Sequence, residues 1–398
     1  MAKIDDSVKK KVPELRFKGF TDPWVQRNLA DLSDGFSYGL NAAAKEYDGV
    51  HGYLRITDID EVSHSFLPEG LTSPDVPENQ LTDYRMDEQS IVYARTGAST
   101  GKTYIYRDSD GELYYAGFLI RQKVNKETSA QFVYQNTLTK AWERYVQVMS
   151  QRSGQPGINA QEVGRFELAI PEKAEQDKIA HLFNSLDNLI AANQRKLDLL
   201  KEQKKGYLQK MFPKNGSKFP QLRFAGFADA WEQRKLGDLV NVDTGSRNHQ
   251  DAVQGGRYPF YVRSENIEAL DEYDFDETAI LVPGDGRIGE IFHFVQGKFA
   301  LHQRVYKLDG FTGVMPEFLI QLLRHGFRKH ALRMNAQGTV PSLRKPVFTE
   351  WQVLIPNTKE QKPISYLLRC LDKTIALHQR KLEKLQELKK GYLQKMFC

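Results

Sequence analysis

The sequence predicts an α+β protein with an internal duplication, in which an antiparallel two-helix coiled coil separates two sheet-rich domains. The first observation is that PELRFKGFTDPWVQRNLADL (13–32) returns as PQLRFAGFADAWEQRKLGDL (220–239), identical at 13 of 20 positions. The second is that QRKLDLLKEQKKGYLQKMF (194–212) returns as QRKLEKLQELKKGYLQKMF (379–397), identical at 15 of 19. Repeats this far apart exclude a solenoid, whose period is about 20–50 residues. Because the repeated sequences occur in the same order in both halves, we predict a pseudo-twofold molecule whose halves perform the same kind of function on different targets.

The repeats divide the chain into alternating domains and helical segments. Pro213 and Gly216 end the first helical segment, because neither residue continues a helix well. The predicted divisions are an N-terminal tail (1–12), a first sheet-rich domain (13–166), a helical spacer (167–212), a linker (213–219), a second sheet-rich domain (220–351) and a second helical spacer (352–398).

The divergent segments between the repeats have the pattern of sheet-rich units. Aromatic and β-branched runs alternate with glycine-rich turns, as in SIVYARTG (90–97) and AILVPGDG (279–286). Such runs predict short strands. Residues 137–151 and 315–334 have the pattern of helices that support those sheets.

The shared helical segments each show apolar residues at a 4–3 spacing, which predicts long amphipathic helices of about 35 residues. Each helix has one apolar stripe, so we expect the two stripes to be buried against each other. Asn193 and His378 interrupt the stripes at equivalent places, which is more typical of a register-setting residue than of a metal ligand. The predicted seam consists of Ile179, Phe183, Leu186, Ile190, Asn193, Leu197, Leu200, Ile364, Leu368, Leu371, Ile375, His378, Leu382 and Leu385.

Composition excludes several classes of protein. The net charge of +5 permits a nucleic-acid partner without requiring one. No stretch approaches the roughly 18 apolar residues of a membrane span, and the N-terminus lacks the apolar core of a secretory signal. Two cysteines are too few for a disulfide framework or a cysteine-built zinc site. We therefore expect no membrane association, no metal and a cytoplasmic location.

Two pairs of loops carry side chains suited to DNA. The glycine-rich loops TGASTGKT (96–103) and PGDGRIGE (283–290) each hold a cation, which suits phosphate contact. The polar loops SQRSGQPGIN (150–159) and NAQGTVPSLRK (335–345) hold side chains that can form paired hydrogen bonds with base edges. Plain hairpin turns and solvent-exposed loops are the alternatives. The candidate DNA-binding residues are Arg95, Ser99, Thr100, Lys102, Gln151, Arg152, Gln155, Asn159, Arg247, Asn248, Arg287, Gln303, Arg304, Gln337, Thr339, Arg344 and Lys345.

Catalytic motifs are missing from the sequence. TGASTGKT has one residue too few between its glycines for a phosphate-binding P-loop, and a strand-like sequence follows it, which argues against an ATPase. We find no methyltransferase cofactor loop, nuclease acid cluster, metal-binding histidine spacing or Gly-x-Ser-x-Gly elbow. We therefore expect no catalytic residues and no catalysis by the chain alone.

The two variable segments, the repeated lead PxLRFxGFxxxW and the terminator KKGYLQKMF together resemble the DNA-specificity subunit (HsdS) of type I restriction–modification systems. The resemblance covers essentially the whole chain. It implies that each variable segment is a target recognition domain reading one half of a bipartite site in double-stranded DNA. It also implies that the coiled coil sets the spacer and docks two methyltransferase subunits, to which restriction subunits add. S-adenosylmethionine, ATP and Mg²⁺ are then expected on those partner subunits. The alternative is a non-catalytic scaffold whose variable domains bind proteins.

Overall fold

The computed structural model describes residues 12–151, 155–214, 216–334 and 342–397. The chain forms two compact units. Unit 1 combines the chain up to Asn193 with the segment from Lys381 onward, and unit 2 runs from Gln194 to Arg380. Each unit therefore contains one variable segment together with one end of each long helix. The described helices all lack the long apolar stretch that a bilayer crossing requires.

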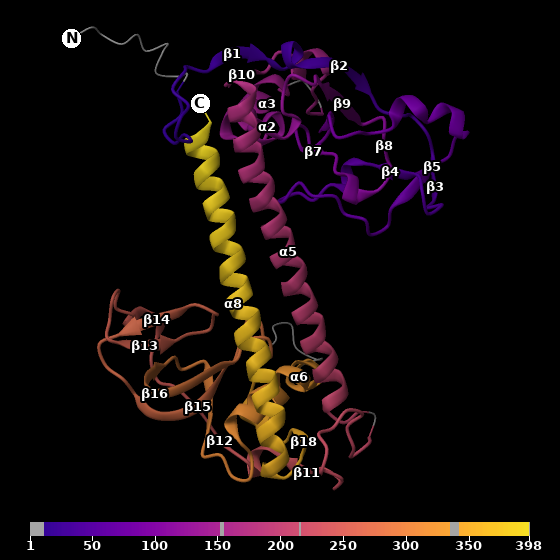
Figure 1. Cartoon of the computed structure of the whole chain (residues 1–398). Coiled ribbons are helices and arrows are strands. Elements are labelled where there is room, and N and C mark those ends of the chain that lie inside the picture. Colours follow the sequence, from indigo (N-terminus) through magenta and orange to yellow (C-terminus); the bar gives the residue numbers. More distant parts are fainter. Residues whose placement is uncertain (1–11, 152–154, 215, 335–341, 398) are drawn as a thin grey trace, which may run out of the picture. The chain divides into compact units, whose positions relative to one another are not determined.

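The two shared segments form the long helices α5 (Lys173–Met211) and α8 (Thr358–Met396), coloured magenta and yellow in Figure 1. Each has 39 residues, so each is about 58 Å long at a rise of 1.5 Å per residue. The helices begin a few residues later than the predicted spacers at 167 and 352, because a short strand precedes each one: β10 (Glu167–Ile170) and β18 (Gln352–Ile355).

The long helices run in opposite directions within each unit. In unit 1, Phe183 contacts Phe397 with ring centroids 5.6 Å apart, and Asp187 forms an ion pair of 2.7 Å with Lys389. Residue numbers thus rise along α5 as they fall along α8. In unit 2, Lys204 pairs with Asp372, while the end of α5 shares a core with the start of α8. The predicted antiparallel pairing is confirmed.

Every residue of the predicted seam is buried or partly buried. Buried Asn193 donates its Nδ2 to the carbonyl of Leu189 at 2.7 Å, so its amide is satisfied by its own helix. His378 is partly buried, and its Nδ1 has no hydrogen-bond partner among the described residues. Both polar residues are thus shielded from solvent at least in part.

Unit 1 is built on a small antiparallel sheet with order β2-β9-β6-β7, formed by Ser33–Tyr38, Leu119–Val124, Ser90–Ala94 and Thr103–Ile105. Three strand pairs accompany it: β1 (Val25–Asn28) with β10, β3 (Ala44–Glu46) with β5 (Thr72–Pro74), and β4 (Gly52–Leu54) with β8 (Leu113–Tyr115). The unit also contains the helices α2 (Ala130–Asn136), α3 (Lys140–Met149) and α4 (Ala160–Gly164).

Unit 2 repeats this plan with a larger sheet. Its order is β12-β17-β15-β16-β13-β14, formed by Asn241–Thr244, Val305–Asp309, Phe275–Pro283, His293–Leu301, Tyr258–Tyr261 and Ile267–Leu270. Strand β11 (Glu232–Lys235) pairs with β18, and the helices are α6 (Pro316–Met334) and α7 (Lys345–Thr349). The order β12-β17-β15-β16 matches β2-β9-β6-β7, so the two variable segments share a fold although their sequences differ.

The repeated lead and terminator sequences recur because they bind each other. In unit 1, the Leu15 amide donates to the carbonyl of Lys395 at 2.8 Å. In unit 2, the Leu222 amide donates to the carbonyl of Lys210 at the same distance. The lead of each repeat therefore lies on the helix end of the other repeat, which explains why both sequences are kept in both copies.

The lead is also tied to its own repeat's helix by a buried ion pair. Arg16 binds both carboxylate oxygens of fully buried Glu175 at 2.7 Å, and the Trp24 indole donates to the same carboxylate at 3.2 Å. Arg223 binds Glu360 with the same two distances. The arginine that both leads share thus fixes the start of a long helix.

Candidate nucleic-acid interface

Three chain segments meet at one edge of unit 1, and we call residues 95–101, 116–119 and 155–159 site 1. The Arg95 amide donates to the carbonyl of Phe118 at 3.1 Å, and the Ile158 amide donates to the carbonyl of Arg95 at 2.9 Å. The Gly97 amide donates to Pro156 at 3.0 Å. Backbone hydrogen bonds therefore join the predicted glycine-rich loop to the predicted polar loop.

The same three segments meet in unit 2, and we call residues 284–290, 302–305 and 342–345 site 2. The Gly284 amide donates to the carbonyl of Arg304 at 2.8 Å, and the Leu343 amide donates to the carbonyl of Gly284 at 2.6 Å. An isolated bridge joins Asp285 to Ser342, as one joins 96 to 157 in site 1. The equivalence of the loops predicted from the sequence is thus present in the backbone.

One glycine in each of these loops allows close packing against a helix. Gly101 has φ +86°, and a Cβ there would lie 2.6 Å from a methyl of Val146 on α3. Gly289 has φ +66°, and a Cβ there would lie 2.7 Å from the Cα of Arg328 on α6. In site 1 the loop joins the antiparallel strands β6 and β7, so no helix follows it as in a P-loop.

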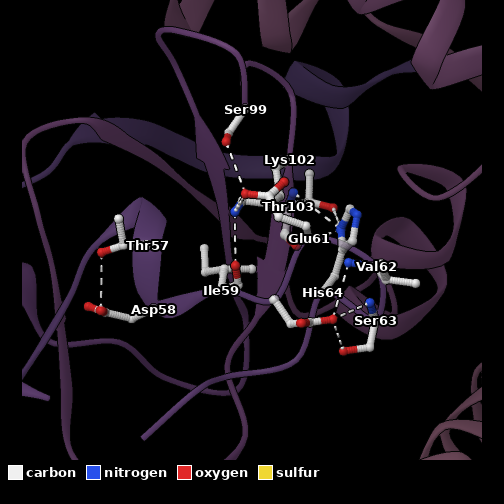
Figure 2. A network of polar contacts seen from close by, with 11 residues as sticks. Thr57, Asp58, Ile59, Glu61, Val62, Ser63, His64, Ser99, Lys102 and Thr103 are labelled. Carbon is white, nitrogen blue, oxygen red and sulfur yellow. Dashed lines mark hydrogen bonds and ion pairs between the residues drawn. The ribbon is translucent and has the colours of Figure 1, made fainter. Parts of the chain in front are cut away.

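Lys102 lies inside unit 1, and this placement argues against the predicted phosphate contact. Only 6% of the residue is exposed. Its ammonium donates to the carbonyl of Ile59 at 2.8 Å and to Glu61 at 2.6 Å, while Ser99 donates to the same Glu61 oxygen at 3.2 Å (Figure 2). The hydrogen bond from Lys102 lowers the pKa of the Glu61 carboxyl. A DNA phosphate would have to displace this carboxylate before it could reach Lys102.

Other candidates of site 1 have mixed roles. The guanidinium of Arg95 lies over the Tyr38 ring, 4.9 Å from its centroid. Asn159 caps α4, because its Oδ1 accepts from the Glu162 amide at 2.9 Å. The Thr100 hydroxyl donates within the loop to the carbonyl of Gly97. The exposed amides of Gln151 and Gln155 are the ones positioned at the surface for a partner.

Several candidate cations in and beside site 2 are already paired with carboxylates. Exposed Arg287 binds Glu290 at 2.9 Å and Glu265 at 3.2 Å, and its hydrogen bond lowers the pKa of the Glu290 carboxyl. Arg247 binds Asp274 at 2.8 Å and Glu272 at 3.1 Å. Lys345 pairs with Asp243 at 3.3 Å. Each of these cations must share or release a carboxylate when it binds a phosphate.

Two candidate arginines of site 2 are not paired with a carboxylate among the described residues. Arg304 and Arg344 are exposed, and in the described part of the chain no hydrogen bond or ion pair engages their guanidinium groups. Gln303 and Asn248 bond to each other through their side chains at 2.5 Å. The candidates Arg152, Gln337 and Thr339 lie outside the described residues.

Sequence reasoning missed the turn 116–119 of site 1. It carries Phe118, whose side chain is exposed. The equivalent turn of site 2 carries the predicted candidates Gln303 and Arg304. The sequence AGF (116–118) lies between two strand-like runs, which indicates a turn. An apolar residue type does not, however, predict an exposed side chain.

Known proteins resemble this chain in sequence. The family model described as the type I restriction modification DNA specificity domain matches residues 9–202 and 228–387. The chain is 30% identical over 165 residues to the type I restriction enzyme EcoDI specificity subunit of Escherichia coli, a match that covers 41% of this chain but only 36% of that subunit. It is 22% identical over 376 residues to the type I restriction enzyme MjaVIII specificity subunit of Methanocaldococcus jannaschii, covering 87% and 85% of the two chains.

The fold is also found in a solved structure. The crystal structure of the type I restriction-modification system S subunit from M. genitalium superposes with a TM-score of 0.74 at 15% identity. The match covers 97% of this chain and 99% of that chain. It therefore supports the fold over nearly the full length.

Proposed function

Because the chain belongs to the type I restriction modification DNA specificity family, we propose that it is the DNA-reading subunit of a type I restriction–modification complex. In this role each unit reads one half of a bipartite target in double-stranded DNA. The observation that carries the proposal is the repetition of one backbone site with different side chains: sites 1 and 2 have equivalent hydrogen bonds, yet Phe118 stands where Arg304 does. Two sites with the same backbone and different side chains suit a DNA target whose two halves differ in sequence.

The exposed polar side chains of the two sites are the groups that would read bases. Arginine pairs with guanine and glutamine pairs with adenine through two hydrogen bonds in the major groove, each pair contributing about 1–3 kcal/mol of discrimination. Gln155 in site 1 and Arg304 and Arg344 in site 2 are free to do this. Phosphate contacts fix the position of the protein on the duplex without selecting a sequence.

The long helices supply the partner surface in this proposal. We infer that α5 and α8 set the number of unread base pairs between the half-sites and dock two methyltransferase subunits, to which restriction subunits add. The chain itself would be non-catalytic, so that S-adenosylmethionine, ATP and Mg²⁺ are bound by those partners. The cytoplasm, where the genomic DNA of a prokaryote lies, is the location that this role requires.

The direct test is to express the chain with its methyltransferase subunits and to sequence the methylated bases of the host genome. We expect one motif made of two specific half-sites and an unread spacer, and we expect the purified complex to protect that sequence from nuclease digestion. Absence of any protected or methylated motif, with an intact complex, would contradict the proposal and favour a protein-binding scaffold.

A further inference from the structure

Phe118 is an exposed aromatic ring on a rigid turn. The turn joins β8 to β9 and is closed by a hydrogen bond of 2.8 Å from the Leu119 amide to the carbonyl of Ala116. Both of these flanking residues are buried, whereas Phe118 is 64% exposed. The ring therefore projects from a fixed backbone and adds little to the core of unit 1.

The same backbone position is tied into site 1. The Phe118 carbonyl accepts from the Arg95 amide, and the Arg95 carbonyl accepts from Ile158 in the polar loop. The Tyr38 ring, 45% exposed, lies under the Arg95 guanidinium. The edge that carries the candidate base-reading groups thus has an apolar component, which the polar candidates alone do not supply.

Site 2 shows that the fold does not require an aromatic residue here. Arg304 occupies the equivalent turn and its carbonyl accepts the equivalent hydrogen bond, from the Gly284 amide. The backbone is kept while the side chain changes from an apolar ring to a cation. A position that varies in this way on a constant frame is suited to choosing a target.

We propose that Phe118 is a specificity-determining contact of site 1 that packs against the 5-methyl group of a thymine in the first half-site. The inference rests on the proposed function. The methyl group of thymine is the apolar feature that base edges present in the major groove, and phenylalanine is one of the side chains that contact it. Burying one methyl group changes a binding constant by about fourfold.

The test uses the complex of the full chain with its methyltransferase subunits and the methylated motif found for it. Duplexes are prepared in which each thymine of the first half-site is replaced in turn by deoxyuridine, which lacks only the methyl group. Binding constants are measured at one salt concentration for the unaltered chain and for Phe118→Ala, Phe118→Leu and Val50→Ala. Val50 is a matched control, because it is an exposed apolar residue of unit 1 outside site 1.

We expect one thymine whose replacement weakens binding by the unaltered chain about fourfold and has no effect on binding by Phe118→Ala. Phe118→Leu should keep part of the sensitivity, and Val50→Ala all of it. A double-mutant cycle of this form isolates the contact from other effects of the substitution. Each variant should discriminate between bases of the second half-site as the unaltered chain does, and this serves as the control that the variant is folded.

Two results would overturn the inference. One is a first half-site without a thymine on either strand. The other is that Phe118→Ala weakens binding to the thymine duplex and to the matching deoxyuridine duplex by the same factor, whichever thymine is replaced. Either result leaves the proposed function standing, since specific binding by the unaltered complex tests that separately.

Discussion

Sites 1 and 2 share a backbone and differ in almost every exposed side chain. Both join three segments by the same hydrogen bonds, and both use a glycine to bring the first loop against a helix. Beside site 1, Lys102 is buried and paired with Glu61, and within site 1 the ring of Phe118 is exposed. Site 2 exposes three arginines, of which Arg287 is held by carboxylates. The comparison separates a constant frame, which holds the segments in place, from the side chains that a target would meet.

The frame itself is where the largest effect is expected. Glu175→Ala removes a buried carboxylate from Arg16 and from the Trp24 indole, and breaking such a pair costs about 3–5 kcal/mol. Glu360→Ala should cost about 1 kcal/mol less, because no hydrogen bond to the Trp231 indole N–H is found among the described residues. Urea unfolding of the full chain, followed by hydrogen exchange in peptides of each unit, measures both values. Equal losses would mean that the two frames are energetically alike despite this difference.

Base discrimination is the next largest effect. Gln155→Ala removes an exposed amide from site 1 and should relax discrimination at one position of the first half-site by about 1–3 kcal/mol. Affinity for unrelated DNA should change little. Titrations on matched and mismatched duplexes at fixed salt check this. An equal loss on both kinds of duplex would remove Gln155 from the base-reading residues.

A contrast between two arginines of site 2 comes third. Arg304→Ala should weaken binding about tenfold and reduce the slope of log K against log salt by about one, because an exposed, unpaired cation that lies close to the duplex releases counterions. Arg287→Ala should have a smaller effect, because Glu265 and Glu290 already hold that side chain. Binding measured across a salt series separates the two. A larger loss from Arg287→Ala would show that the carboxylates position this arginine for DNA instead of competing with it.

The smallest effect on DNA binding is expected for Lys102→Met. The ammonium is buried and bonds to Ile59 and Glu61, so we expect an unchanged salt dependence together with a loss of stability. Arg304→Ala serves as the positive control in the same salt series. A slope reduced by about one would show that DNA displaces Glu61 and that Lys102 reaches a phosphate after all.

Much of the frame could be predicted from the sequence, because the duplication marks it. The lead and terminator recur since each packs on the other copy, as the Leu15–Lys395 and Leu222–Lys210 hydrogen bonds show. The 4–3 spacing predicts a stripe whose residues are all buried or partly buried in the structure. The short strands at 167–170 and 352–355 were assigned to the helices, because a few apolar residues before a helix have no period of their own.

The candidate sites could be located but not resolved into roles. The sequence predicts that the loops are equivalent, and the described parts have equivalent backbone bonds. Spacing cannot show, however, that Glu61, distant in the sequence, covers Lys102. Nor could it show that Asn159 is a helix cap or that Arg287 is held by two carboxylates. These outcomes depend on contacts between segments far apart in the chain, whereas the composition of a loop reports only which groups are available.

The division of reading between the two units is tested most directly by exchanging one variable segment. Residues 33–165 are replaced by the corresponding segment of a relative with a different target, residues 213–398 are left intact, and the methylated motif is sequenced. We predict that one half of the motif changes while the other half is retained. A motif altered in both halves, or in neither, would contradict the assignment of one half-site to each unit.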